Sequence, residues 1–426
     1  MNLNMLHPAE QLAVTMKRIY EFRLTTTSGG NLSIKDEEGN IWITPGSIDK
    51  GNLTKDDMVC IKPDGTIVGR HNPSCEYPFH TIIYKVCPHI KAVLHAHPQD
   101  LVAYAIVRKI PNMRAIRQAY LNCGSVGMAK YAIAGSHLLA ERIAEVFAQG
   151  YKHVLMENHG VIIGAETMAE AFGQFETLET TAEILTKAET LGEINYLDSS
   201  VFKDGKEPRM ATYETIEYTC KEKEARMELC KFAARSYRQG IINSVQGDFS
   251  VRTGENSFVI TPDKKDRLYL SPEDIVGVQN GKTEDGKKPA FAAPLHQKIY
   301  ELHPEINGII FSQPVNAMAF AITNHDLTSS TIPESYMMMR NIKRLSKPAF
   351  LMSPETVASE FDKSTPIVMS PNDGFIVSGT SLLDAFDRLE VTDKTAASIL
   401  LSRSLGNIVH IDQQGLDEIR IKINLK

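Results

Sequence analysis

Residues 30–53 read GNLSIKDEEGNIWITPGSIDKGNL, and residues 247–270 read GDFSVRTGENSFVITPDKKDRLYL. The two stretches align without a gap at a displacement of 217 positions, and the alignment continues to both sides with slips of one to three positions. The matches are Tyr20 with Tyr237, Gly30 with Gly247, Ile43-Thr44-Pro45 with Ile260-Thr261-Pro262, Leu53 with Leu270, Pro78 and His80 with Pro294 and His296, and Ala171-Phe172 with Ala385-Phe386. Such an ordered series predicts two copies of one domain.

The stretch 197–220 between the copies lacks helical or strand periodicity and is interpreted as a linker. We therefore expect a first domain at 1–196 and a second at 221–426. Each copy begins with an amphipathic helix and continues with short strands bounded by Gly and Pro, and the helices expected are 9–22, 135–149, 166–190 and 222–238. This mixture favours a layered α/β or α+β domain over a bundle or a sandwich.

Composition is that of an ordinary globular protein, with 42% hydrophobic and 23% charged residues in 426. Lys and Arg total 46 against 52 for Asp and Glu, without long runs of either sign, so we expect no nucleic-acid partner. No basic leader precedes an apolar core and no apolar segment has spanning length, so no membrane partner and a cytoplasmic location are expected. The six cysteines form no CxxC pair, which favours reduced thiols.

Residues 91–98, KAVLHAHP, form a short apolar run that ends at Pro98 and predict a strand. Because residues two apart on a strand point the same way, His95 and His97 share one face with Cα atoms about 6–7 Å apart. Two imidazoles at that spacing can converge on one ion at about 2.0–2.1 Å. The alternative is a pair of packed or exposed histidines at a strand end.

Two further residues have chemistry suited to the same site. His159 lies in VLMENHGVIIG, where an Asn-His-Gly break between apolar runs can present a side chain at a rim, or can be a plain turn. Glu76 precedes the apolar helix pattern of 79–87, where an acidic residue is also common as a helix cap.

The second copy serves as an internal comparison for these residues. Glu76 falls on Ala292, His95 on Phe311, His97 on Gln313 and His159 on Asp373, whereas the neighbouring Pro98, Asn158 and Gly160 persist as Pro314, Asn372 and Gly374. Structural side chains would be retained in part. Their joint loss predicts one shared divalent-metal site in the first copy, which the second has abandoned.

Three hydroxyl-rich turns of the first copy suit an anion such as phosphate. They contain Gly30-Asn31, Thr44 with Gly46, and Ser74-Cys75. Turn chemistry alone explains each of them as well. In the second copy Asn31 becomes Asp248, which would repel an anion, and Ser74 becomes Ala290.

In this order, SGGNLS, ITPG, PSCE, VLHAHP and ENHG make the first copy resemble the class II aldolase and adducin-head family over residues 9–190. The resemblance implies an α/β fold of three layers, a central sheet flanked by helices, in each of two tandem copies. It also implies that His95, His97 and His159 bind Zn²⁺, that Glu76 is the acid/base residue, and that Asn31, Thr44 and Ser74 bind phosphate. A supporting tyrosine is expected, but neither Tyr120 nor Tyr131 matches cleanly.

The implied function is that of a zinc-dependent lyase that cleaves or forms a C–C bond in a phosphorylated ketose through a metal-bound enediolate. A dehydratase, epimerase or decarboxylase acting on a sugar or sugar-acid phosphate needs the same ligands and stays open. A non-catalytic, metal-stabilised scaffold like the adducin head is the alternative from another class. The resemblance also implies a fourfold ring, so a homo-oligomer is expected, in which two chains of two fused domains each complete a pseudo-fourfold ring.

Overall fold

The computed structural model describes residues 3–202, 210–214 and 217–422. The chain divides into two compact units, which are described separately. The first unit comprises residues up to 113 together with 119–183, and the second comprises residues 114–118 together with 184 onward. No helix of the described residues is long and apolar enough to cross a membrane.

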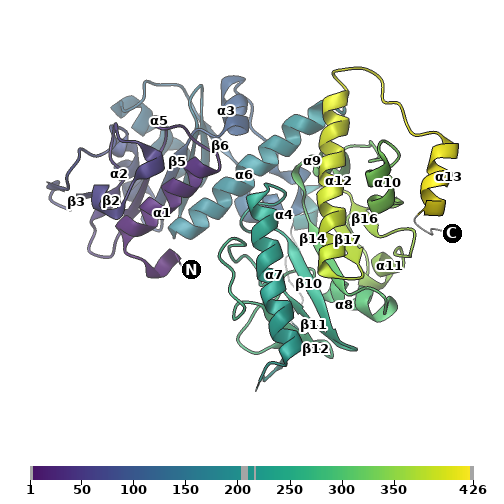
Figure 1. Ribbon diagram of the computed structural model, residues 1–426. Helices are drawn as coiled ribbons and strands as arrows, with labels where there is room; N and C mark the ends of the chain where they lie inside the picture. The colour runs from purple at the N-terminus through teal and green to yellow at the C-terminus, as the bar shows by residue number, and fades with distance from the viewer. Residues whose placement is uncertain (1–2, 203–209, 215–216, 423–426) are drawn as a thin grey trace. The chain divides into compact units, whose positions relative to one another are not determined.

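The first unit is built on an eight-stranded sheet in the order β4-β3-β2-β1-β5-β8-β7-β6 (Figure 1). Neighbouring strands are antiparallel except for the pair β6 and β7, which is parallel. The strands are β1 (Asn31–Lys35), β2 (Ile41–Ile43), β3 (Val59–Ile61), β4 (Ile67–Val68), β5 (Ala92–Ala96), β6 (Gly127–Ala129), β7 (His153–Met156) and β8 (Val161–Ala165).

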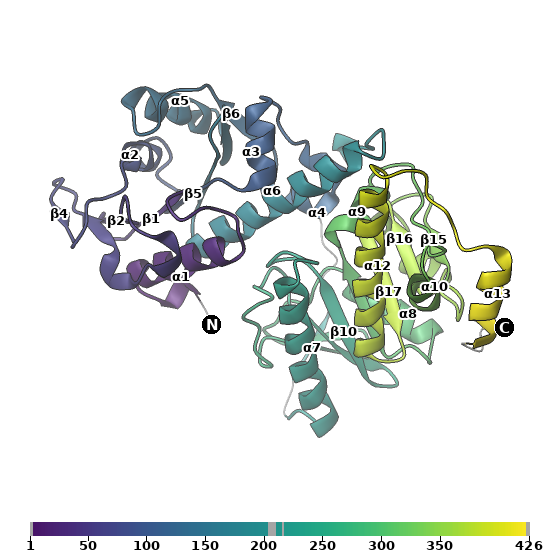
Figure 2. The same ribbon diagram turned by 45° about the horizontal axis from the view of Figure 1, so that its top comes forward.

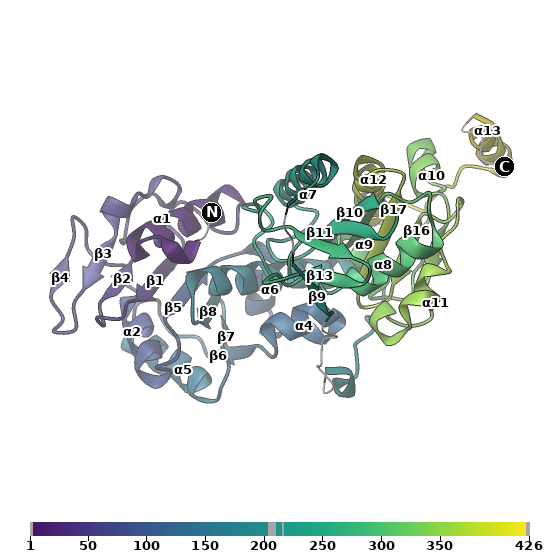
Figure 3. The same ribbon diagram turned by 90° about the horizontal axis from the view of Figure 1, so that it is seen from below.

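Helices cover both faces of this sheet. On one face, Phe79 and Ile83 of α2 and Phe147 of α5 pack with Val93 and Ile162 of the strands in one buried cluster. Figure 3 shows α1 on the other side of the strands. The helices are α1 (Pro8–Glu21), α2 (Tyr77–Val86), α3 (Gln99–Ile106), α4 (Arg117–Cys123), α5 (His137–Ala148) and α6 (Met168–Glu189), with 3-10 turns η1 (Leu3–Met5), η2 (Lys50–Asn52), η3 (Lys55–Asp57) and η4 (Met113–Ala115). Helices α4 and α6 and turn η4 each include residues of the second unit, which contains 114–118 and 184 onward.

The second unit repeats this topology in the order β13-β12-β11-β10-β14-β17-β16-β15, with β9 added outside β13. Its parallel pair, β15 with β16, occupies the place of β6 with β7. The strands are β9 (Thr212–Tyr213), β10 (Asp248–Gly254), β11 (Ser257–Ile260), β12 (Val276–Gln279), β13 (Lys282–Glu284), β14 (Gly308–Ser312), β15 (Ile342–Arg344), β16 (Ile367–Ser370) and β17 (Gly374–Gly379).

The helices of the second unit also lie on both faces of its sheet (Figure 3). Helices α7 and α12 run side by side on one face, where Arg235 pairs with Glu390 at 3.5 Å (Figure 1 and Figure 2). On the other, α8 and α11 pack over the strands. The helices are α7 (Cys220–Arg238), α8 (Ala293–Leu302), α9 (Val315–Ala321), α10 (Pro333–Met339), α11 (Pro354–Ala358), α12 (Leu382–Ser402) and α13 (Gln413–Lys422), with 3-10 turns η5 (Ser199–Phe202) and η6 (Ala349–Leu351).

The registers of the two sheets agree position by position. Asn31 faces His95 across β1 and β5, and Asp248 faces Phe311 across β10 and β14. The expected α/β fold in two copies is confirmed, and the four expected helices form as α1, α5, α6 and α7.

The observed boundary between the units differs from the expected domain limits. Asn195 donates its backbone N–H to the Ile322 carbonyl at 2.7 Å, so residues before 197 already pair with the second unit. Inside 197–220, Thr212–Tyr213 forms β9, which pairs with β13. Backbone groups can make these pairs whatever the side-chain pattern, so the segment lacks periodicity although part of it belongs to a sheet.

Candidate active site

The chain brings three histidines together from the end of one strand and a neighbouring turn. His95 lies on β5, His97 follows it, and His159 lies in the turn between β7 and β8. Asn158 adopts a left-handed φ of 56° in that turn. A Cβ at Gly160 would lie 2.6 Å from the Ala96 carbonyl oxygen and 2.5 Å from His97 Cδ2, so only glycine allows the turn to approach this closely.

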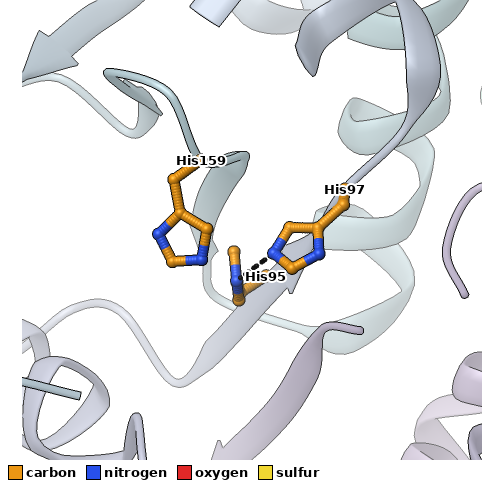
Figure 4. Close-up of side chains that lie close together, drawn as sticks. All are labelled: His95, His97 and His159. Carbon is orange, nitrogen blue, oxygen red and sulfur yellow. Dashed lines mark hydrogen bonds between the residues drawn. The ribbon is translucent and has the colours of Figure 1, made fainter. Parts of the chain in front are cut away.

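The imidazoles converge on one point (Figure 4). The possible ligand atoms of all three lie within 4.8 Å of one another, and Nε2 of His97 is 3.0 Å from Nε2 of His95. His95 Nδ1 lies 2.9 Å from the Val161 carbonyl oxygen, which only a protonated Nδ1 can bond. That bond assigns the proton to Nδ1 and leaves the Nε2 lone pair facing the other histidines, as a metal ligand requires.

Glu76 completes this cluster rather than capping α2. It occupies the N-cap position but makes no capping bond with its side chain. Its Oε2 is 3.3 Å from His95 Nε2 and its Oε1 is 3.5 Å from His159 Nε2. Buried Oε1 has no hydrogen-bond partner among the described residues, and the charge of a cation held by the imidazoles would stabilise it there. These donors therefore fit a divalent metal ion.

The protonation states also suit metal binding. Burial lowers the pKa of His97 to about 3 and that of His159 to about 4, so both imidazoles are neutral near pH 7. Burial alone would raise the pKa of Glu76, but His95, His159 and the Asn31 amide hold it well below its usual range. Neutral imidazoles beside an ionised carboxylate are the ligand forms a dication needs.

A buried chain of hydrogen bonds stands behind Glu76. Asn31 Nδ2 donates to Glu76 Oε2 at 2.7 Å, and Asn31 Oδ1 lies 2.5 Å from His80 Nε2. His80 Nδ1 lies 2.7 Å from the Ser33 hydroxyl, which also lies 2.7 Å from the Tyr84 hydroxyl. Sequence reasoning placed His80 only in the scaffold and missed this link. It was not visible because the partners are 45 or more positions apart.

The three turns expected to bind an anion lie in contact beside this cluster. Ser74 N–H donates to the Thr44 carbonyl at 3.2 Å, and Gly46 N–H donates to the Asn72 carbonyl at 3.1 Å. Cys75 is exposed. Gly30, at φ 75°, packs against β5, where a Cβ would lie 2.7 Å from the His95 carbonyl oxygen. The turns thus meet, and their phosphate-binding role stays a prediction.

Lys50 is a further residue of this region that sequence reasoning missed. It is 2% exposed, and its Nζ donates to the Pro45 carbonyl at 2.5 Å. Burial lowers the pKa of Lys50 to about 8, although the Cys75 thiol and Glu76 act in the opposite direction. The sequence offered one signal, because the repeat places a second basic residue, Arg267, at the matching position. The structure shows that Arg267 is also buried.

Helix α3 starts directly after the His97-Pro98 pair, and a side chain of α6 binds its N-terminus. Glu179 accepts the backbone N–H groups of Asp100 and Leu101 at 2.9 and 3.0 Å. In the second copy Asp393 accepts those of Asn316 and Ala317 at 2.8 and 3.3 Å. In both copies, therefore, a buried carboxylate binds the N-terminal N–H groups of the helix that follows strand β5 or β14.

Comparisons with known proteins identify the family of the chain. The family model for the class II aldolase and adducin N-terminal domain matches residues 10–186 and again residues 227–400. A 3-oxo-tetronate 4-phosphate decarboxylase of Haemophilus influenzae is 28% identical over 200 residues, which are 46% of this chain and 94% of that protein. An L-fuculose phosphate aldolase of Methanococcus maripaludis is 30% identical over 167 residues, covering 39% of this chain and 89% of that protein.

Among solved structures, an L-fuculose 1-phosphate aldolase is 32% identical, with a TM-score of 0.43 over 46% of this chain and 92% of that one. Each of these relatives matches less than half of this chain, whereas the family model matches the chain twice, once in each copy. The chain is thus a tandem member of the class II aldolase and adducin N-terminal domain family.

Proposed function

We propose that the first copy is a zinc-dependent class II aldolase-type lyase that cleaves or forms a C–C bond in a phosphorylated ketose. The observation that carries the proposal is the convergence of three imidazoles beside a buried carboxylate with one oxygen unsatisfied. The L-fuculose phosphate aldolases among the relatives support the substrate class. A scaffold would not need that carboxylate.

Within this proposal, His95, His97 and His159 hold the metal ion, which when bound supplies Lewis acidity at a substrate oxygen. Glu76 moves the proton at the reacting carbon. Its Oε2 is held by Asn31, which His80 orients in turn, so Oε1 is the oxygen left to exchange a proton. Phe79, 1% exposed and 5.6 Å from the His95 ring, keeps water from one side of the cluster.

The substrate phosphate would lie against the turns of Asn31, Thr44 and Ser74. Lys50 gives this region a buried positive charge, and its counter-charges are close by. A buried ammonium interacts with an anion far more strongly than an exposed one, because little water screens it. Lys50 therefore favours a doubly charged phosphate over an uncharged group.

The direct test is to screen phosphorylated ketoses for release of dihydroxyacetone phosphate. Full-length protein loaded with zinc should turn over at least one of them, the protein stripped by a chelator should not, and zinc should restore the rate. Elemental analysis should give about one ion per chain. Two ions per chain, or activity that survives stripping, would contradict the proposal.

Decarboxylation is the second candidate, and the decarboxylases of 3-oxo-tetronate 4-phosphate among the relatives favour it. Both reactions break a C–C bond next to a carbonyl group and need the same cation and acid/base groups. Release of CO₂ from a 3-oxo sugar-acid 4-phosphate, without dihydroxyacetone phosphate from any ketose, would select this reaction over aldol cleavage.

We also propose that two chains form a ring of four domains in which active and inactive copies alternate, because a closed ring needs each domain to offer both sides of an interface. Light scattering should give a mass of two chains or a multiple of two. A monomeric and fully active chain would refute this assembly.

A further inference from the structure

The second copy contains a pocket at the position where the first copy has its histidine cluster. Phe311, Gln313 and Asp373, which replace the three histidines, line it together with Asp248 and Arg267, the counterparts of Asn31 and Lys50. About 50 Å³ of the pocket is enclosed space that water-sized groups can occupy, within a half-open hollow of about 500 Å³ that includes solvent at its mouth. A small molecule would therefore lie mainly in the mouth and reach the inner part with a few polar groups.

The charges of this pocket are arranged to cancel. Arg267, 1% exposed, donates to the backbone carbonyls of Gln246 and Gly247 at 2.9 Å each, and its Nη2 lies 3.8 Å from Asp248 Oδ1. The Arg117 guanidinium lies over the Phe291 ring, 4.2 Å from its centroid, and its charge acts on Asp373. Each of these two acids thus has an arginine nearby.

The carboxyl groups of Asp248 and Asp373 are ionised in solution near pH 7.5. Burial raises the pKa of Asp248 and of Asp373 to about 6, although Arg267 and Arg117 act in the opposite direction. The other charged side chains at the pocket are Asp263 and Lys264. The three acidic and three basic groups of the lining therefore leave no net charge for an ionic ligand to neutralise.

The pocket also has polar atoms prepared for a ligand. Gln246 is 4% exposed and Ser312 is 3% exposed, yet neither Gln246 Oε1 nor Ser312 Oγ has a hydrogen-bond partner in the described ranges. Gln246 is oriented by a bond from its Nε2 to Gln313 Oε1 at 2.7 Å, and Gln313 donates in turn to the Asp373 carbonyl at 2.8 Å. Buried polar atoms normally have partners, so this acceptor and this hydroxyl are unsatisfied groups that could bond a ligand group reaching the inner part of the pocket.

Two ligand classes are disfavoured. Within the described residues, the group of side chains close enough to share a metal ion is His95, His97 and His159, which lies in the other copy. A phosphate would meet Asp248 and Asp373 and would find Ala290 where the first copy has a serine.

We propose that this pocket binds a small neutral polyhydroxy compound, a sugar or polyol without phosphate. Each hydroxyl of such a compound both donates and accepts, so it can donate to the carboxylates and Gln246 Oε1 and accept from the guanidinium groups. Phe291 and Phe311 supply apolar surface for its C–H groups. The second copy then keeps a ligand site of the same substrate family after losing the metal and the phosphate contacts.

Calorimetric titration of the full-length chain at pH 7.5 with ribitol, D-ribose and inorganic phosphate tests the proposal. Ribitol or D-ribose should bind to the wild type, and should still bind to His97→Ala, which damages only the first copy. Ser312→Ala and Gln246→Leu should each weaken that binding at least tenfold. Circular dichroism and melting curves show which variants are folded. Ser312→Ala removes one hydroxyl oxygen that makes no hydrogen bond within the described residues, so it keeps the test valid if Gln246→Leu does not fold.

Three results would overturn the proposal. The first is no binding of either neutral compound to a folded wild-type chain. The second is binding that His97→Ala abolishes, which would assign it to the first copy. The third is phosphate binding that Ser312→Ala or Gln246→Leu weakens while the neutral compounds do not bind, which would make the pocket an anion site.

Discussion

The two copies share a buried serine, histidine and tyrosine but use the histidine differently. In the first copy Ser33 lies 2.7 Å from His80 Nδ1 and from the Tyr84 hydroxyl, and in the second Ser250 lies 2.8 Å from His296 Nδ1 and from the Tyr300 hydroxyl. His80 Nε2 continues to Asn31 and Glu76. His296 Nε2 is buried without a partner in the part of the chain that the structure describes.

This difference separates what the fold needs from what the chemistry needs. Three side chains joining β1 to α2 are retained after the site is lost, so their packing and hydrogen bonds serve the scaffold. The link from the scaffold to the site is one residue long. In the second copy Asp248 takes the place of Asn31 and its Oδ2 accepts the Ala292 backbone N–H at 3.1 Å, while the chain of bonds from Ser250 ends at His296.

The largest expected effect comes from removing a metal ligand that the second copy lacks. His95→Ala should release the metal and lower turnover by about a thousandfold, because Lewis-acid stabilisation worth several kcal/mol disappears. Elemental analysis and steady-state rates measure both quantities. His89→Ala, an exposed histidine on the same unit, is the matched control and should keep both. Loss of neither in His95→Ala would remove the basis for a metal site here.

Glu76→Gln should separate metal binding from proton transfer. The amide is nearly the same size as the carboxylate but cannot exchange a proton, so kcat should fall by about 10²–10⁴ while most of the metal stays bound. Rates and metal content of the same preparation give the answer. Full activity would show that Glu76 is not the acid/base group.

Asn31→Asp places the residue of the second copy in the first. The change puts a second carboxylate beside Glu76 and removes the donor that holds Oε2. We expect kcat to fall by about 10–100-fold, as is typical when a supporting hydrogen bond is lost at a metal site. If KM for the phosphorylated substrate rises and kcat is unchanged, Asn31 binds phosphate and does not position Glu76.

Lys50 and Arg267 offer a matched pair for testing the buried charge. Lys50→Met should raise KM for a phosphorylated substrate by about tenfold, because the nearby positive charge is lost. Lys50→Arg, the residue that the second copy tolerates at this position, should recover part of that loss. An unchanged KM in a folded Lys50→Met variant would assign Lys50 to packing alone.

The smallest expected effect concerns the carboxylate that holds α3. Burial raises the pKa of Glu179 to about 8, against the two backbone N–H groups that it accepts. The folded chain then keeps a proton that the unfolded chain releases above pH 4.5, so this contribution to stability is complete below that pH and is lost as the pH rises toward 8.

Glu179→Gln should therefore gain stability relative to the wild type between pH 5 and pH 8, by about 1 kcal/mol or more. Urea unfolding at the two pH values measures the change. Asp393→Asn is the counterpart in the second copy, where burial also raises the pKa, and should change in the same direction. A difference that is independent of pH in both variants would show that these groups are ionised throughout.

Sequence reasoning was most effective where the repeat could act as a comparison. The duplicated fold and the helices α1, α5, α6 and α7 followed from local pattern, and Glu76 and the three histidines stood out because all four change together. The structure brings those four side chains together. Their roles stay predictions until they are measured.

What the sequence did not reveal depends on packing between distant positions. Lys50 and His80 look like ordinary scaffold residues until burial and partners are known. Strand β9 has two residues, which is too short for any periodicity to show. The pairing of residues 194 and 195 with the rest of the second unit was also not visible, because backbone groups make it and the side-chain pattern does not record them.

Strand β9 has a practical consequence for anyone who cuts this protein in two. A fragment starting at residue 221 lacks β9, so β13 becomes a sheet edge with free N–H and C=O groups that another chain can pair with. A fragment starting at residue 210 keeps that edge covered. Aggregation of the shorter piece would thus report an uncovered strand, and says nothing about whether the second copy can fold by itself.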